Sequence, residues 1–144
     1  MLRASMLPKL RRFRQVTQGG VLPMFAIAII PVIGFVGASV DYSRAGNART
    51  EMQQALDATA LFISKTAGTQ TAQQIQTAAV NYFNAQFTNT EATNITVTAT
   101  YTTTGGSALT IAATGKVATH FMGLLGFASL NIGSSTTVRW GNTK

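Results

Sequence analysis

The pattern of apolar and polar residues divides this chain into three parts. Residues 21–40 are apolar at nearly every position and carry no charge. From about residue 45 to residue 63, apolar side chains recur every three or four positions, the spacing of one helix face. Beyond Thr88, apolar and polar side chains alternate, as in a strand with one buried face. The pattern predicts a helix that is first uniformly apolar and then amphipathic, and a sheet after it.

The apolar segment is long enough to cross a membrane. At a rise of about 1.5 Å per residue, about twenty helical residues span about 30 Å, the thickness of a bilayer's hydrocarbon core. A soluble domain of this size rarely covers all faces of such a helix. We therefore expect a transmembrane helix at residues 21–40, between a leader of residues 1–20 and an exported domain of residues 41–144. A secretory signal cleaved near residues 37–39, or a transit peptide, is the alternative.

The apolar segment also carries small residues on one face, namely Gly34, Gly37 and Ala38. Small residues let two helices in a membrane approach each other closely. The pattern therefore favours packing of this face against another helix. Contact with lipid alone would explain the same composition.

The positive charge of the chain is concentrated before the apolar segment. The net charge is +7, and five of the 11 Lys and Arg residues lie in the first fourteen positions. Only Arg44 and Arg49 lie close behind the segment. Because positive charge stays on the cytoplasmic side of a span, we expect a cytoplasmic N-terminus and a periplasmic C-terminal domain. Topology and anionic lipid explain the basic leader, so it does not indicate nucleic-acid binding.

Two helices are expected in or leading into the exported part. The first continues from the membrane over residues 22–67, with Gly68 as its C-terminal stop. The second covers residues 71–87 and begins at a capping box formed by Thr71 and Gln74. Its apolar stripe includes Ile75, Ala79 and Phe83, and we expect this stripe to pack on the first helix while Gln76 faces water.

Three antiparallel strands should follow the helices. The first covers residues 94–101, and the turn at Gly105-Gly106 leads to a second strand around residues 109–117. A third strand carries Leu130, Ile132, Val138 and Trp140 on one face. A three-stranded sheet with one apolar face needs a cover, which the helices supply. The predicted fold class is α+β, pilin-like, with a long N-terminal transmembrane helix that continues into the exported domain.

The composition excludes most catalytic chemistry. The chain has one His, no Cys and four Asp or Glu residues. A metal site needs three or four ligands, and no group of such residues is close in the sequence. No glycine-rich phosphate loop is present either. We therefore expect no enzyme activity, no catalytic or metal site and no cofactor.

Two segments stand out as candidates for binding another protein. Asp41 follows the apolar segment directly, and it either lies solvated at the membrane surface or forms, with Tyr42 and Arg44, an ordered pair with a neighbouring subunit. Residues 121–127, which we call the apolar loop, carry no polar side chain. This loop, with Leu124 and Leu125 at its centre, either folds into the core or stays exposed and binds a partner or the membrane.

The sequence resembles a known family in two places. A basic leader ending in Gly19-Gly20, an apolar helix and VGASVDYSRAGNARTEMQQALDATAL at residues 36–61 are similar to the N-terminal region of TadE/TadG-like pilus-assembly proteins of the Tad (tight adherence, Flp) system. Residues 117–135, VATHFMGLLGFASLNIGSS, resemble the C-terminal part of short members of that class.

The resemblance implies a function and a processing step. It implies a minor pilin-like structural component of pilus assembly, anchored in the bacterial inner membrane and working with other assembly components or pilin subunits. It also implies cleavage by a prepilin peptidase between Gly20 and Val21. Phe25 then stands fifth in the mature chain, where pilins commonly carry Glu. The alternative function is a membrane-anchored exported protein that binds another envelope component and has no pilus role.

Overall fold

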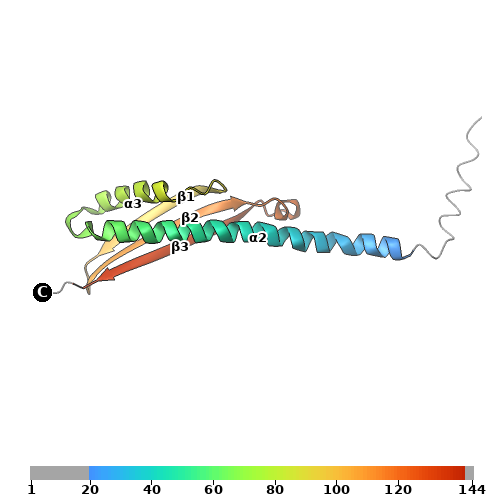
Figure 1. Cartoon of the computed structure of the whole chain (residues 1–144), viewed down its shortest axis with the longest axis horizontal. Coiled ribbons are helices and arrows are strands. Elements are labelled where there is room, and N and C mark those ends of the chain that lie inside the picture. Colours follow the sequence, from blue (N-terminus) through green and yellow to red (C-terminus); the bar gives the residue numbers. More distant parts are fainter. Residues whose placement is uncertain (1–19, 142–144) are drawn as a thin grey trace, which may run out of the picture. The chain divides into compact units, whose positions relative to one another are not determined.

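The computed structural model describes residues 20–141, and Figure 1 shows its helices and strands. The elements are α2 (Val21–Ser64), the 3-10 helix η2 (Ala67–Thr69), α3 (Ala72–Gln86), β1 (Ala92–Thr102), β2 (Ser107–Ala118), the 3-10 helix η3 (Met122–Leu125) and β3 (Ser129–Trp140). The predicted α+β class is therefore confirmed. Residues 1–19, which hold nearly all of the predicted leader, lie outside the described residues.

The contacts within the chain divide it after Val36 into two units. The described part of the first unit consists of residue 20 and the apolar beginning of α2, whose large side chains are exposed to solvent. Within the described residues, α2 is the one helix long and apolar enough to cross a membrane, and only 6% of its most apolar stretch is buried. A helix in the core of a soluble protein would be mostly buried, so this stretch lacks the protein cover that such a helix has.

The second unit begins at Gly37 and contains the amphipathic part of α2. The buried residues of α2 recur every three or four positions, as predicted; they are Gly37, Asp41, Ala45, Ala48, Met52, Ala55, Leu56, Thr59, Ala60 and Ile63. The helix ends at Ser64, three residues before the predicted end. The Ser64 and Thr66 hydroxyls donate to the carbonyls of Leu61 and Ile63, which satisfies carbonyls of the last turn.

Gly68 does not end α2, and this detail of the prediction was wrong. Gly68 lies inside η2 and does not have the positive φ of a left-handed C-terminal cap. The glycines that do adopt a positive φ include Gly105 and Gly106, at 76° and 116°, which form the predicted hairpin turn between β1 and β2. The hydroxyls of Ser64 and Thr66 thus satisfy the end of the helix, which Gly68 was expected to do.

The second helix, α3, begins and packs as predicted. The Thr71 side chain accepts a hydrogen bond from the Gln74 backbone N–H, and the Gln74 side chain accepts one from the Thr71 N–H. Ile75, Ala79 and Phe83 are buried in the core. Tyr82 stacks on Phe62 of α2 with the ring centroids 4.3 Å apart, so aromatic contacts join the two helices directly.

The sheet has the order β1-β2-β3, with both neighbouring pairs antiparallel. The central strand β2 alternates between buried positions, among them Leu109 and Ile111, and more exposed ones. Asn94 interrupts the register of β1 in a bulge, with a φ of 53° that Asn tolerates better than most residues. The predicted alternation in this strand holds beyond the bulge.

One hydrophobic core joins α2, α3 and one face of the sheet. Its largest buried side chains are Phe83 from α3, Met52, Leu56 and Ile63 from α2, Ile75 from α3, and Leu109, Ile111 and Val117 from β2. Gly115 of β2 is needed for this packing, because a Cβ there would collide with the Ile95 side chain and come within 3.6 Å of Met52 Cε.

Gln76 does not face water, contrary to the prediction. Its side-chain amide donates to the Val97 carbonyl and accepts from the Ala99 N–H, each at 2.8 Å. These backbone groups belong to β1, which pairs with β2 on one edge only. Gln76 therefore satisfies part of the free edge of the sheet, where unpaired backbone groups invite aggregation. The helical periodicity gave no sign of this contact, because it assigns polar residues to solvent.

Replacing Gln76 with Ala should lower the free energy of unfolding by about 1–3 kcal/mol, since it removes two hydrogen bonds of about 0.5–1.5 kcal/mol each. The measurement is chemical denaturation of the full chain in detergent, followed by the fluorescence of Trp140, which stacks on Tyr101. The matched control is Gln73→Ala, on an exposed position of the same helix, which should change stability by less than about 0.5 kcal/mol. Equal effects of the two substitutions would contradict the edge-covering role.

Candidate functional site

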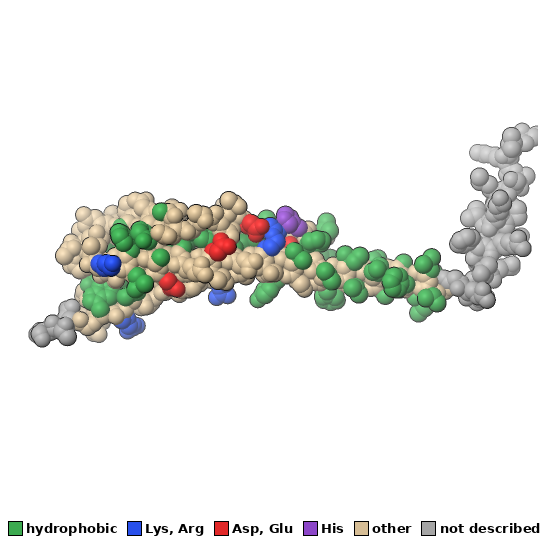
Figure 2. Space-filling model, in the orientation of Figure 1, with side chains coloured by type: hydrophobic (Ala, Val, Ile, Leu, Met, Phe, Trp, Pro, Cys, Tyr) green, Lys and Arg blue, Asp and Glu red, His purple; other side chains and the backbone are tan. Residues whose placement is uncertain are grey.

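The candidate site lies in the second unit, where the segment between β2 and β3 meets α2. The segment turns through η3, the short 3-10 helix inside the apolar loop. The segment contacts two residues of α2 that lie one helical turn apart, Gly37 and Asp41. In the space-filling view, the purple His side chain lies beside blue and red charged side chains and close to green hydrophobic ones (Figure 2).

Asp41 binds the start of this turn through three backbone hydrogen bonds. Its carboxylate accepts from the N–H groups of His120, Phe121 and Met122 at 2.9, 2.9 and 2.8 Å. The first N–H groups of any helix lack partners within the helix, so they need an acceptor from elsewhere. Here the acceptor comes from a different helix about eighty positions earlier in the chain. Only 1% of the Asp41 surface is exposed, so the residue is not solvated.

These contacts determine the charge state of Asp41. Burial by itself raises the pKa of the carboxyl, but the hydrogen bonds from Met122, His120 and Phe121 lower it, with a smaller contribution from the charge of His120. The net result is a pKa below the ordinary value of an aspartate. The ionised form is therefore the one that the fold binds.

Arg44 connects Asp41 to the start of the sheet. Its Nη1 lies 3.9 Å from Asp41 Oδ1, and its Nε and Nη2 donate to Glu91 Oε1 at 3.2 and 3.0 Å. Glu91 directly precedes β1, and the neighbouring Asn89 donates to Glu51 of α2 at 2.8 Å. These polar contacts thus join α2 to the start of the sheet at the end of the core nearest Asp41.

Gly37 lets Phe121 lie directly against the backbone of α2. A Cβ placed on Gly37 would overlap the Cβ, Cγ and Cδ1 atoms of Phe121. The close approach that the small residue was predicted to allow is therefore used by a side chain of the same chain. At Gly34 a Cβ would meet nothing within 4 Å, so the predicted packing of Gly34 and Ala38 on another helix stays a prediction.

The apolar loop is ordered by its own backbone yet exposes its side chains. The N–H groups of Leu124, Gly126 and Phe127 donate to carbonyls within the loop, and the Thr119 hydroxyl donates to the Phe127 carbonyl. Leu124, Leu125 and Phe127 are nevertheless 87%, 66% and 61% exposed. Of the two alternatives left open by the sequence, the structure shows the exposed loop.

Residues 19–62 of the chain match a family model. The model is Tad, described as "Putative Flp pilus-assembly TadE/G-like". This Tad match confirms the resemblance in the N-terminal part of the chain, and its described part consists of Gly20 and most of α2, with Gly37, Asp41 and Arg44. The apolar loop, α3 and the sheet lie outside the matched residues. No curated protein and no solved structure matches the chain.

The remaining predicted residues of the Tad-matched segment are exposed. Tyr42 is 75% exposed. Gly20 and Val21 are exposed at the beginning of the described chain, where the predicted cleavage point lies. The partners of Asp41 and Arg44 were not found from the sequence, because they are backbone N–H groups and a glutamate 47 positions away from Arg44.

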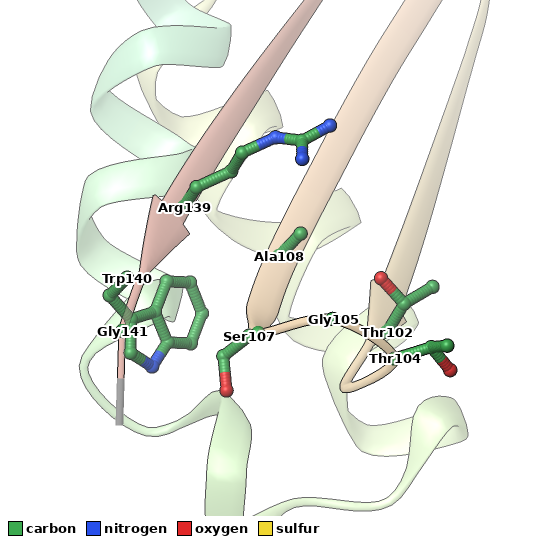
Figure 3. A pocket seen from close by; sticks show the side chains of 9 residues that line it. Thr102, Thr104, Gly105, Ser107, Ala108, Arg139, Trp140 and Gly141 are labelled. Atoms are coloured by element: carbon green, nitrogen blue, oxygen red, sulfur yellow. The ribbon is translucent and has the colours of Figure 1, made fainter. Parts of the chain in front are cut away.

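A hollow lies at the opposite end of β2, beside the Gly105-Gly106 turn. It has a volume of about 380 Å³ and is lined by the ends of the three strands, including Ser107, Arg139 and Trp140 (Figure 3). Its described lining contains no carboxylate, thiol or imidazole that could work with Arg139 in acid–base chemistry. Within residues 20–141, no group of three or more His, Cys, Asp and Glu side chains could hold a metal ion.

Acid should destabilise the fold partly through Asp41. Because its pKa is lowered in the folded state, its contribution is complete above the pKa of an unfolded aspartate, about 3.9, and is lost as the pH falls below that value. Asp41→Asn should therefore lower the denaturation midpoint at pH 7 and reduce the further loss between pH 7 and pH 3. The cationic side chain nearest to the Asp41 carboxylate is Arg44, with its Nη1 3.9 Å from Oδ1.

The matched control for this measurement is Asp57→Asn, an exposed carboxylate on the same helix that accepts a hydrogen bond from Gln53. It should leave the acid loss close to that of the unchanged chain. If Asp41→Asn and the unchanged chain lose stability in parallel, Asp41 does not act through its charge.

Gly37→Ala should destabilise the second unit although alanine is the better helix former. The new Cβ collides with Phe121, and overpacking of this kind costs about 1–3 kcal/mol. Gly46→Ala on the same helix is the control, because a Cβ there meets nothing within 4 Å, so the substitution should stabilise by about 0.5–1 kcal/mol. Denaturation of both variants in detergent measures the difference, and a shared sign would contradict the close contact.

Proposed function

We propose that this protein is a membrane-anchored, minor pilin-like structural component of Tad pilus assembly, without enzymatic activity. The observation that carries the proposal is that the Tad match falls on α2. This one helix contains both the apolar segment and the stripe that packs into the core of the second unit. The first part of this helix is therefore suited to an apolar environment, and the second part packs into a folded domain.

The anchoring role rests on the exposed apolar side chains of residues 21–40. In water they would cost about 25 cal/mol for every Å² of apolar surface, and a bilayer removes this cost. The helix has the length that a bilayer requires. We therefore place residues 21–40 in the bacterial inner membrane.

The orientation rests on the sequence. Five of the basic residues precede the span and only Arg44 and Arg49 follow it closely, which favours a cytoplasmic N-terminus and a periplasmic domain of residues 41–144. Cleavage by a prepilin peptidase between Gly20 and Val21 would remove the basic leader. Both residues are exposed, which is a requirement for cleavage.

Other assembly components or pilin subunits are the proposed partners. Two parts of α2 are the proposed contacts. They are the small-residue face with Gly34 and Ala38, where a Cβ on Gly34 would meet nothing within 4 Å, and the exposed Tyr42 in the second unit. Helices that carry small residues can pack side by side within the membrane, which is how subunits of a membrane-embedded assembly could meet before export.

Deleting the gene should lower the number of Tad pili on the cell, and supplying the full chain should restore it. A chain with Ile27→Arg and Ile33→Arg should not restore pili, because two charges in the middle of the span each cost about 2.5–3.5 kcal/mol on insertion. The matched control, Ile27→Leu with Ile33→Leu, should restore them. Electron microscopy of negatively stained cells gives the count.

The same strains separate the pilus role from the alternative. A reporter enzyme that works only outside the cytoplasm, fused after Lys144, should be active in the unchanged chain. An active reporter together with unchanged pili in the deletion strain would leave an anchored binding protein without a pilus role. An inactive reporter would contradict the proposed orientation.

A further inference from the structure

The exposed apolar loop has no assigned role in the fold. Its three most exposed large side chains, Leu124, Leu125 and Phe127, stand outside the hydrophobic core. Residues 121–127 carry neither charged nor polar side chains. An exposed apolar cluster of this kind in a small domain marks a surface that something else covers.

The position of the loop indicates what covers it. Phe121 packs against Gly37, and Asp41 binds the backbone at the start of η3. Gly37 belongs to the last turn of the proposed span, and Asp41 is the first residue behind it. The loop is therefore held at the level along α2 where the bilayer ends. Val40, between Gly37 and Asp41 on α2, is also a large apolar side chain exposed to solvent.

The backbone of the loop is suited to an environment with little water. An unpaired N–H or C=O costs several kcal/mol in hydrocarbon, so backbone near lipid needs partners within the protein. The Asp41 carboxylate accepts hydrogen bonds from the N–H groups of residues 120–122, and three more N–H groups donate to carbonyls inside the loop. A loop that water alone surrounds would not require these bonds, because water would satisfy its backbone.

The charged groups lie on the side of Asp41 away from the span. Arg44 is one turn further along α2 and pairs with Glu91 at 3.0 Å. Within the described residues, the charges of α2 begin at Asp41 and continue through Arg44, Arg49 and Glu51. Along α2, apolar side chains are thus followed by charged ones. The layers of a membrane change in the same order, from hydrocarbon to headgroups and water.

We propose that the apolar loop is a second membrane contact, which inserts Leu124, Leu125 and Phe127 into the interface of the periplasmic leaflet beside the span. The occupant is the lipid surface. The proposal rests on the anchoring and orientation proposed above. A helix alone lets a domain tilt against the membrane, whereas a second contact restricts the tilt. Asp41 and Gly37 would then set which face of the domain is presented to other assembly components.

The absence of cysteine allows a direct test with single spin labels. Three variants of the full chain, Leu124→Cys, Thr104→Cys and Phe25→Cys, carry a nitroxide and are reconstituted in vesicles of phosphatidylethanolamine and phosphatidylglycerol. Leu124 is the most exposed of the loop side chains, so its replacement does not disturb the core. Thr104 lies exposed in the hairpin at the other end of β2, and Phe25 lies in the proposed span. Power saturation compares access of oxygen, which enters lipid, with access of a nickel chelate, which stays in water.

The expected result is preferential oxygen access at residues 25 and 124 and preferential nickel access at residue 104. Nickel access at 124 with oxygen access at 25 would overturn the loop contact and leave the anchor intact. Nickel access at both 25 and 124 would overturn the anchor as well. Poor access of both reagents at 124, with spin–spin broadening that unlabelled chain removes by dilution, would show a second copy on the loop and overturn the lipid contact.

Discussion

The three hydrogen bonds between the Asp41 carboxylate and the backbone at residues 120–122 join α2 to the segment between β2 and β3. Asp41 stands where α2 changes from an apolar helix to an amphipathic one. Without an acceptor at this point, the N–H groups at the start of η3 would lose their partner within the protein. The segment between β2 and β3 would then lose its attachment to α2. Both the exposure and the position of the apolar loop follow from this contact.

The second unit depends on similar side-chain contacts at its other edges. Gln76 pairs with the free edge of β1, and Arg44 with Glu91 joins α2 to the start of the same strand. Phe62 and Tyr82 stack between the helices. In a chain without cysteine, these contacts and the core replace the disulfides that many exported domains use. The unit is therefore held by these contacts around a core to which α2, α3 and the sheet all contribute.

The Tad match covers only a part of the molecule that the structure describes. The match ends at residue 62, within α2, while the surfaces that a partner or a membrane could contact include the apolar loop beyond it. Asp41 is the residue that joins the two, because it lies in the matched segment and binds the loop. A pilus-assembly role therefore draws its support from the helix, and the proposed second membrane contact from the loop that this helix positions.

Those features that depend on local periodicity could be predicted from the amino-acid sequence. The apolar run before Asp41, the stripe that includes Met52 and Leu56, the capping box at Thr71 and the alternation around Val97 each predicted the correct element, because helices and strands repeat their buried faces at fixed spacings. The hairpin at Gly105-Gly106 followed from the freedom of glycine at positive φ. The contacts between residues far apart in the chain became visible only in the folded molecule. They join Asp41 to the backbone at residue 121, Arg44 to Glu91, Gly37 to Phe121, and Gln76 to the edge of β1. Backbone donors and acceptors are the same at every residue, so no pattern of side chains shows which of them a distant carboxylate or amide will bind.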